Sequence, residues 1–180
     1  MLLGYGAKNC WCFKDWLDIN LRLNEDVPKD ISLGRDYSLL LGYEGANASG
    51  KTNALKVFAF IADFAKNSFS YSTESSILFD SFFNNNNPSE FYVEFMDTDG
   101  LEYRYEAVLH KDHVEKELLF LVKSTMEEIY FERTNNEITI NKLYDNENKI
   151  ILRNNASFIS TLHQYGIQEI NDVYDFFAKN

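Results

Sequence analysis

Eight consecutive residues, Gly45 to Thr52, have the clearest potential for chemistry in this chain. They read Gly-Ala-Asn-Ala-Ser-Gly-Lys-Thr and match the pattern G-x-x-x-x-G-K-[ST] at every fixed position. In that pattern the glycines let the backbone bend so that successive amide N–H groups converge on a phosphate. The helix that follows adds its positive N-terminal end. The sequence therefore predicts a phosphate-binding loop for a nucleoside triphosphate.

Each residue type in this loop has an expected task. We expect the Lys51 ammonium to reach the β- and γ-phosphates, which makes it the predicted catalytic residue. The Thr52 hydroxyl is the predicted ligand of Mg²⁺, because magnesium prefers hard oxygen ligands and usually takes few from protein. The predicted ATP contacts in and beside the loop are Gly45, Ala46, Asn47, Ala48, Ser49, Gly50, Lys51, Thr52 and Asn53.

Two flanking elements must hold the loop in place. Tyr37 and the run from Leu39 to Leu41 predict a short apolar strand directly before it, and Asn53 to Lys66 predict a helix directly after it. Apolar residues cover most of the circumference of this helix, which indicates a helix buried between two layers.

An antiparallel strand pair is predicted ahead of the loop. Leu2 to Ala7 form the first strand, and Trp16 to Leu23 form the second, in which apolar and polar residues alternate. The link between them, Lys8 to Asp15, is both aromatic and polar. Asn9 and Phe13 in this link are predicted to contact the base or ribose of ATP, although a hairpin that packs its own rings explains the same composition.

The rest of the chain reads as strands followed by helices. Residues 68–76 and Asn84 to Pro88 are predicted connections, and a meander of antiparallel strands begins at Glu90. Its predicted strands are Phe91–Phe95, Leu101–Leu109, Glu117–Lys123, Glu127–Glu132 and Glu137–Tyr144. Helical spacing returns at Ser157–Gln164 and Gln168–Ala178.

Composition places the chain among folded globular proteins. Hydrophobic residues make up 45% of its 180 residues, enough for one domain with a sizeable core or for a core with a small subdomain. The net charge of −11 argues against a broad nucleic-acid footprint. The apolar start, Met1 to Tyr5, is interrupted by Gly4 and followed by Gly6 and Lys8. We therefore expect no signal peptide or membrane span and a cytoplasmic location.

The cysteines point to neither a disulfide nor a metal site. Cys10 and Cys12 are separated by one residue, a spacing that seldom has disulfide geometry, so reduced thiols are expected. His110, His113 and His163 have no zinc-like spacing with them.

Four shorter patterns have simpler explanations. Asp97 to Gly100 fit the D-x-x-G motif of GTPases, but Asp and Gly are also turn residues. Asn141 to Tyr144 lack the acid that reads guanine, because Tyr144 takes its place. Ile77 to Asp80 suggest a magnesium-binding strand, although a loop fits better. Glu115 to Glu117 are predicted to form a solvated charged turn.

The order of elements resembles a known family. A strand pair, a Gly-Ala-Asn-Ala-Ser-Gly-Lys-Thr loop, a buried helix and an antiparallel meander are similar to the N-terminal half of ABC-type ATPases related to chromosome-maintenance and overcoming-lysogenisation-defect proteins, within the AAA family. Many of those ATPases act in bacterial anti-phage defence. Lys8-Asn9 followed by Phe13 to Asp15 resemble the family's opening pattern, and Tyr103 to Tyr105 resemble its second lobe.

This resemblance implies an α/β fold of the P-loop NTPase class, with a large antiparallel meander and short C-terminal helices. It divides the chain into a nucleotide-binding core (1–67), a β subdomain (68–150) and a helical segment (151–180). The family's signature motif, Walker B acid and catalytic glutamate have no convincing counterpart before residue 180.

The resemblance implies a lobe that binds Mg·ATP as a conformational or assembly switch, in anti-phage defence or DNA maintenance. Efficient turnover would require a C-terminal half or second subunit that carries the missing motifs, and an effector protein or DNA is a further implied partner. The alternatives are a non-catalytic nucleotide sensor or scaffold and, as a lesser one, a GTPase.

Overall fold

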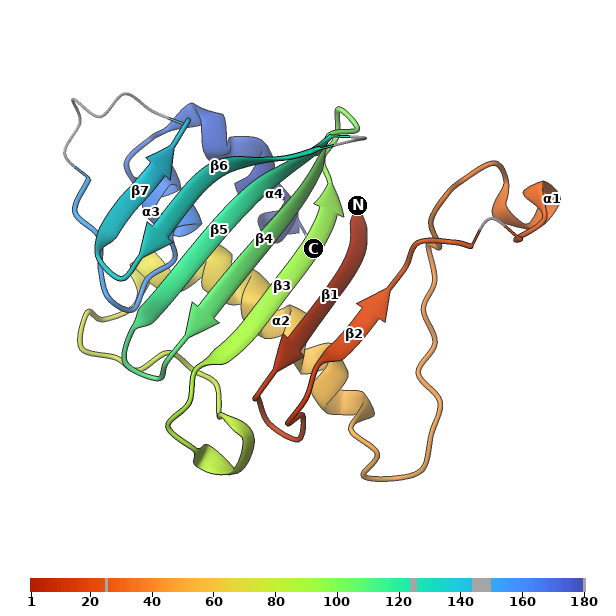
Figure 1. Ribbon diagram of the computed structural model, residues 1–180, viewed down its shortest axis with the longest axis horizontal. Helices are drawn as coiled ribbons and strands as arrows, with labels where there is room; N and C mark the ends of the chain where they lie inside the picture. The colour runs from red at the N-terminus through yellow and green to blue at the C-terminus, as the bar shows by residue number, and fades with distance from the viewer. Residues whose placement is uncertain (25, 124–125, 144–149, 180) are drawn as a thin grey trace.

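The computed structural model describes residues 1–24, 26–123, 126–143 and 150–179. Within these residues seven strands form one antiparallel sheet in the order β2-β1-β3-β4-β5-β6-β7 (Figure 1). The strands are β1 (Leu2–Lys8), β2 (Leu17–Asn20), β3 (Ser89–Met96), β4 (Glu102–Leu109), β5 (Val114–Lys123), β6 (Met126–Thr134) and β7 (Glu137–Asn141). The α-helices are α1 (Lys29–Ser32), α2 (Lys51–Asn67), α3 (Phe158–Gln164) and α4 (Asn171–Lys179), and single 3-10 turns lie at Ser68–Ser70, Phe82–Asn84 and Gln168–Ile170.

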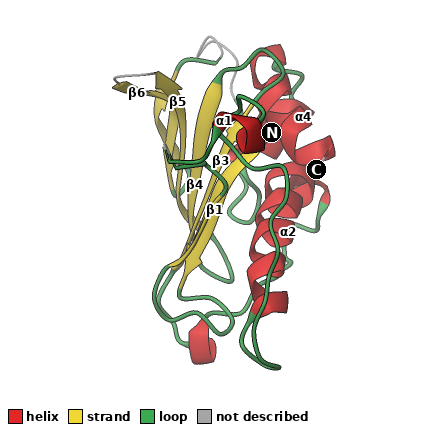
Figure 2. Cartoon of the chain, turned by 90° about the vertical axis from the view of Figure 1, so that its right-hand side faces the viewer, coloured by secondary structure: helices red, strands yellow, loops and turns green. Residues whose placement is uncertain are grey.

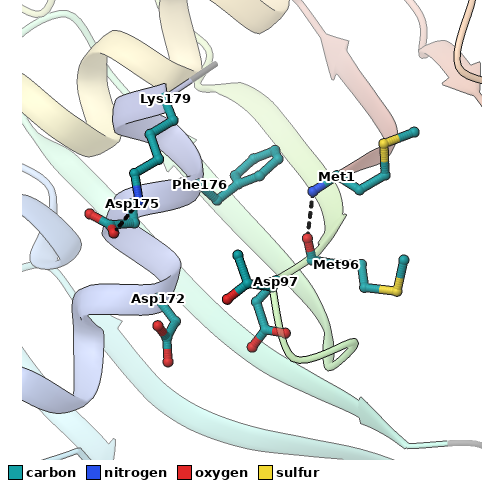
Figure 3. A pocket seen from close by; sticks show the side chains of 8 residues that line it. Met1, Met96, Asp97, Asp172, Asp175, Phe176 and Lys179 are labelled. Carbon is teal, nitrogen blue, oxygen red and sulfur yellow. Dashed lines mark hydrogen bonds and ion pairs between the residues drawn. The ribbon is translucent and has the colours of Figure 1, made fainter.

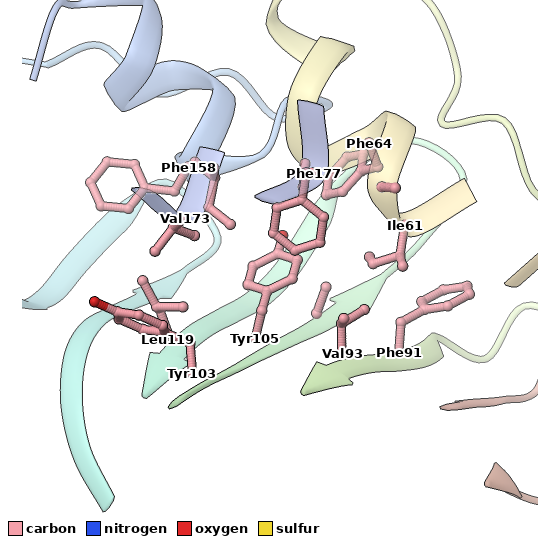
Figure 4. Packing of buried hydrophobic residues seen from close by; sticks show 14 of the residues in the cluster. Ile61, Phe64, Phe91, Val93, Tyr103, Tyr105, Leu119, Phe158, Val173 and Phe177 are labelled. Carbon is pink, nitrogen blue, oxygen red and sulfur yellow. The ribbon is translucent and has the colours of Figure 1, made fainter. Parts of the chain in front are cut away.

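Three helices, α2, α3 and α4, share one hydrophobic core with the sheet, and Figure 2 shows α2 and α4 on the same face of it. Alternate residues of β3 and β4 are buried, as expected for strands with one covered face. Aromatic rings fill much of the space between the layers (Figure 4). The Phe95 ring of β3, for example, stacks on the Phe176 ring of α4 with 4.1 Å between their centroids.

The opposite face of the sheet is polar and carries charge pairs between neighbouring strands. The Arg104 guanidinium lies 2.9 Å from the Glu94 carboxylate, and the Lys116 ammonium lies 2.8 Å from that of Glu132. Gly6 is required on this face, because a Cβ there would lie 2.4 Å from the Tyr92 ring. The alternation predicted for Trp16 to Leu23 is only partly present, because β2 spans Leu17–Asn20, where Leu17 and Ile19 are half-buried and Asp18 and Asn20 are exposed.

The meander and both final helices are confirmed. Asp97 closes the β3–β4 hairpin, since its carboxylate accepts hydrogen bonds from the backbone N–H groups of Asp99 and Leu101, at 2.9 and 2.8 Å. Asp97 to Gly100 therefore form the predicted hairpin turn, and this explains their match to the D-x-x-G pattern without a GTPase. Ile77 to Asp80 form a loop, as expected. Tyr144, at the end of the other GTPase-like motif, lies outside the described residues.

The strand predicted directly before the phosphate-binding loop is wrong. Among the described residues only Tyr37 forms a β-bridge there, to Arg22. Leu39, Leu40 and Leu41 are 61%, 86% and 41% exposed, and this connection runs along the side of the molecule apart from the sheet (Figure 1). A run of apolar residues forms a strand only where a neighbouring strand can pair with its backbone, and none does so here in the described chain.

The following helix is confirmed, but its predicted burial between two layers is not. Ala54, Val57 and Ile61 face the sheet and are buried, whereas Leu55 on another side of α2 is 56% exposed. One layer covers this helix in the described chain. The predicted division at residues 67 and 150 stays a prediction, and strands from its first two segments share the sheet.

The predicted solvated turn at Glu115 to Glu117 is also wrong. Glu117 lies within β5 and is fully buried, and its carboxylate forms an ion pair of 2.8 Å with the equally buried Arg133. The Tyr105 hydroxyl and the Phe158 backbone N–H donate to the same carboxylate. This buried group joins the sheet to the start of α3.

Candidate functional site

The phosphate-binding loop lies at the N-terminal end of α2. Gly50 caps the helix with a φ of 95°, a left-handed conformation that glycine adopts at little cost. Ala48 also has a positive φ of 64°, and the Ser49 N–H donates to the Ala46 carbonyl at 3.2 Å. The predicted loop residues therefore come together as one tight turn that leads directly into a helix of 17 residues.

Lys51 folds back over this turn. Its ammonium donates to the carbonyl oxygens of Gly45 and Ala46, each at 2.7 Å, and lies 3.5 Å from the Ser49 hydroxyl. These contacts hold a positive charge over the centre of the loop. Because carbonyl oxygens are weaker partners for an ammonium than a phosphate is, a phosphate could replace them.

The remaining loop side chains face solvent. Asn47, Ser49 and Thr52 are exposed, as are Ala46 and Ala48, whereas Asn53 is half-buried. Thr52 belongs to the first turn of α2, directly after the lysine. This geometry leaves the loop and the threonine hydroxyl accessible to a ligand from outside.

The link between β1 and β2 packs against the last glycine of the loop. A Cβ placed on Gly50 would lie 3.2 Å from the Cys12 sulfur and 3.6 Å from the Phe13 ring. The structure thus brings Phe13 to the phosphate-binding loop. This position agrees with the predicted place of the link beside the nucleotide, while the contact of Phe13 with the base or ribose stays a prediction.

Asn9 is placed differently. Its side-chain amide donates hydrogen bonds to a loop far along the chain, to the Asn85 side-chain oxygen at 3.0 Å and to the Pro88 backbone carbonyl at 2.9 Å. The Asn85 amide donates back to the Asn9 side chain at 2.7 Å. A contact between Asn9 and the base stays a prediction, because its amide already has these partners.

The two thiols are free and differ in exposure. Cys10 is buried, and burial raises the pKa of its thiol to about 12, whereas Cys12 is exposed beside Gly50. In the ranges that the structure describes, no group of three or more His, Cys, Asp or Glu side chains could hold a metal ion. Likewise, no described helix is long and apolar enough to span a membrane.

A separate hollow lies at the other end of β1. It has a volume of about 140 Å³, and Asp97, Asp172, Asp175 and the Phe176 ring are among its lining residues (Figure 3). The N-terminal amine of Met1, at this end, donates to the Met96 carbonyl. Because the phosphate-binding loop packs on residues that follow the opposite end of β1, this hollow is not part of the candidate site.

One comparison with known proteins found a match. A family described as "AAA domain, putative AbiEii toxin, Type IV TA system" matches residues 45–159, more than half of the chain, beginning at the first glycine of the phosphate-binding loop. Searches of curated proteins and of solved structures found no match. The family match supports a nucleotide-binding domain of the ATPase type.

Proposed function

The chain belongs to this AAA-domain family, and on that premise we propose that it is the ATP-binding lobe of an ABC-type ATPase, in which Mg·ATP acts as a conformational or assembly switch. One observation carries the proposal. The complete phosphate-binding loop forms a tight turn at the N-terminal end of α2, with the Lys51 ammonium over its centre. A positive charge, backbone amides and a helix N-terminus at one point are suited to a polyphosphate.

The residues of this site fit Mg·ATP in charge and in donor type. Lys51 would exchange its two carbonyl partners for β- and γ-phosphate oxygens, and the loop amides and the N-terminal end of α2 would stabilise the remaining charge. Thr52 would supply one hard oxygen to the magnesium ion. When bound, ATP supplies the γ-phosphoryl group that can be transferred to water.

Phe13 is proposed as the wall on the base side. Its ring is half-buried and packs against the last glycine of the loop, so a base that followed the phosphates toward β1 could lie against it. This contact stays a proposal, and so does the preference for adenine, which rests on the ABC-like loop sequence and on the absence of the guanine-reading acid.

A second layer is proposed to complete the site. Leu39 to Leu41 and Leu55 form exposed apolar surface on the connection to the loop and on the helix that follows it. Apolar residues of this kind are usually buried, which supports a C-terminal half or a second subunit that packs on them. In the ATPases that the sequence resembles, that part carries the signature and Walker B motifs.

Binding without efficient turnover is the second candidate. The position of Asp80 favours it. A catalytic magnesium site would need an acid at the end of a strand beside the phosphates, but Asp80 lies in a loop and its carboxylate pairs with the Lys111 ammonium at 2.9 Å. A nucleotide sensor or scaffold would need only the loop, Lys51 and Thr52. Anti-phage defence, DNA maintenance and an effector partner rest on the resemblance alone and stay predictions.

Calorimetric titration with Mg·ATP and with Mg·GTP tests the proposed function. We expect ATP to bind more tightly than GTP. GTP binding tighter by about tenfold, which corresponds to about 1.4 kcal/mol, would overturn the adenine assignment and favour the GTPase alternative. Failure of both nucleotides to bind would overturn the nucleotide site itself.

A further inference from the structure

Three loops that are distant in sequence form one unit around the candidate site. They are the phosphate-binding loop (45–52), the β1–β2 link (9–16) and an asparagine-rich loop (80–88). The link packs against Gly50 on one side. On the other side its Trp11 N–H donates to the Asp80 carbonyl at 2.8 Å, and its Asn9 carbonyl accepts from Phe82 N–H at 3.2 Å.

Backbone strain is concentrated in these three loops. In the part of the chain that the structure describes, seven non-glycine residues have positive φ, and five of them belong to this unit. They are Asn9, Trp11, Ala48, Phe83 and Asn84. Such conformations persist only where surrounding contacts enforce them, and they cluster at ligand and active sites. Something must therefore hold the β1–β2 link and the 80–88 loop in these unfavourable shapes.

The amide pair Asn9–Asn85 is the side-chain contact that joins the two loops directly, in addition to the backbone hydrogen bonds between them. Each side chain donates to the other, with N···O distances of 3.0 and 2.7 Å. The Asn9 amide also lies 3.1 Å from the Asn87 carbonyl, and the Asn85 amide donates to the Phe82 carbonyl at 2.7 Å. The pair thus ties the start of the link to both ends of the 80–88 loop.

We propose that the Asn9–Asn85 pair positions Phe13 against the phosphate-binding loop, so that the 80–88 loop, which has no binding motif, sets the affinity for the base and ribose of the nucleotide. In this proposal Asn9 and Asn85 are positioning residues, and the base contact that the sequence predicts for Asn9 is not part of it. This inference rests on the proposed function, because it assumes that the loop holds a nucleoside triphosphate and that Phe13 faces its base.

Two ligands separate positioning from phosphate binding. Mg·ATP reaches both the phosphate-binding loop and Phe13, whereas magnesium tripolyphosphate reaches only the loop. Asn85→Ala is expected to weaken Mg·ATP by about tenfold, the equivalent of one lost aromatic contact, and to leave tripolyphosphate unchanged. The matched control is Asn86→Ala, an exposed asparagine of the same loop that is outside the pair. It is expected to bind both ligands like the wild type.

A double-mutant cycle with Phe13→Ala adds a readout that a purely structural role would not move. In the Phe13→Ala background Asn85→Ala should cause no further loss of Mg·ATP affinity, because the ring that it positions is gone. Additive losses would overturn the proposal. An equal loss of affinity for both ligands in Asn85→Ala would also overturn it, and so would an unchanged affinity of this variant for Mg·ATP.

Thermal unfolding of every variant shows whether it is folded at the titration temperature. If Asn85→Ala is unfolded at that temperature, Asn85→Asp is used in its place. The aspartate side chain can still accept the hydrogen bond from Asn9 but can no longer donate one to it. This variant is judged by the same outcomes. A wild type that binds neither ligand would mean that the proposed function fails. If the wild type binds both Mg·ATP and tripolyphosphate, but the Asn85 variants change the affinity for the two ligands equally, the positioning role alone fails.

Discussion

Glu117 is a buried charged residue whose position the sequence does not predict. It follows Glu115 and Lys116 and reads as part of a solvated turn, yet strand alternation turns it inward, where it contacts Arg133, Tyr105 and the first N–H of α3. Burial raises the pKa of its carboxyl, while the Arg133 charge and the hydrogen bonds act in the opposite direction. Arg133 in turn donates to the Ala156 carbonyl at 2.6 Å.

Glu117→Gln tests the importance of this buried pair for stability. Removing one charge leaves Arg133 buried without its partner, and such a change typically costs about 3 to 5 kcal/mol. Urea unfolding should show this loss. The control is Glu132→Gln, which breaks the partly exposed pair with Lys116 and should cost below about 1 kcal/mol. Similar small losses in both variants would contradict a structural role for the Glu117 pair.

Residue-level prediction succeeded where chemistry depends on local sequence. The phosphate-binding loop needs neighbouring residues only, so its pattern predicts a turn followed by a helix, although α2 begins at Lys51 and not at the predicted Asn53. Asn9 was different, because the partners of its amide lie more than 70 residues away and follow no motif. Pairing between distant loops is decided by tertiary packing, which no single segment encodes.

Among the elements, the connection before the loop shows the limit of apolar patterns. Leu39 to Leu41 have the composition of a strand that is buried on both faces, yet they are exposed in the described chain. A strand needs neighbours for its backbone groups and a layer for its side chains. The composition therefore fits the proposed second layer, although it predicts the wrong structure for this chain alone.

Leu40→Asp tests this explanation. Because Leu40 is 86% exposed, the change should alter the stability of this chain by less than about 0.5 kcal/mol, as measured by urea unfolding. It should, however, abolish binding of a polypeptide that supplies the proposed C-terminal half, as measured by calorimetry. Leu78→Asp is the control, since Leu78 is 75% exposed in another loop and should affect neither. Binding of that polypeptide equally well to Leu40→Asp would contradict a partner layer at this site.

At the scale of the whole molecule, the sequence predicted the order of elements better than their arrangement. Alternating residues in β3 and β4 and the helical spacing near the end were correct, because each follows from local periodicity. The pairing of β1 with β3 places the first strand of the chain beside the meander, although the paired residues, from Lys8↔Glu90 to Leu2↔Phe95, are far apart in the sequence. That contact depends on the packed core and has no local signal.

We expect the isolated chain to bind Mg·ATP but to hydrolyse it hardly at all. Hydrolysis also needs a group that orients the attacking water and positive charge opposite the γ-phosphate, and the candidate site offers only the loop, Lys51 and Thr52. Phosphate release at saturating Mg·ATP measures this. Turnover near about 1 s⁻¹, which is ordinary for a complete enzyme, would contradict a lobe that depends on a partner.

The most direct measurement is the affinity of Mg·ATP for the wild type and for Lys51→Ala, by calorimetry. Lys51 places its charge over the centre of the loop, and loss of one charge-assisted contact costs about 1.5 to 3 kcal/mol, or about ten- to a hundredfold in affinity. The control is Lys56→Ala, an exposed lysine of the same helix that should bind like the wild type. The account predicts the loss in Lys51→Ala alone, and unchanged affinity in that variant would contradict the nucleotide site.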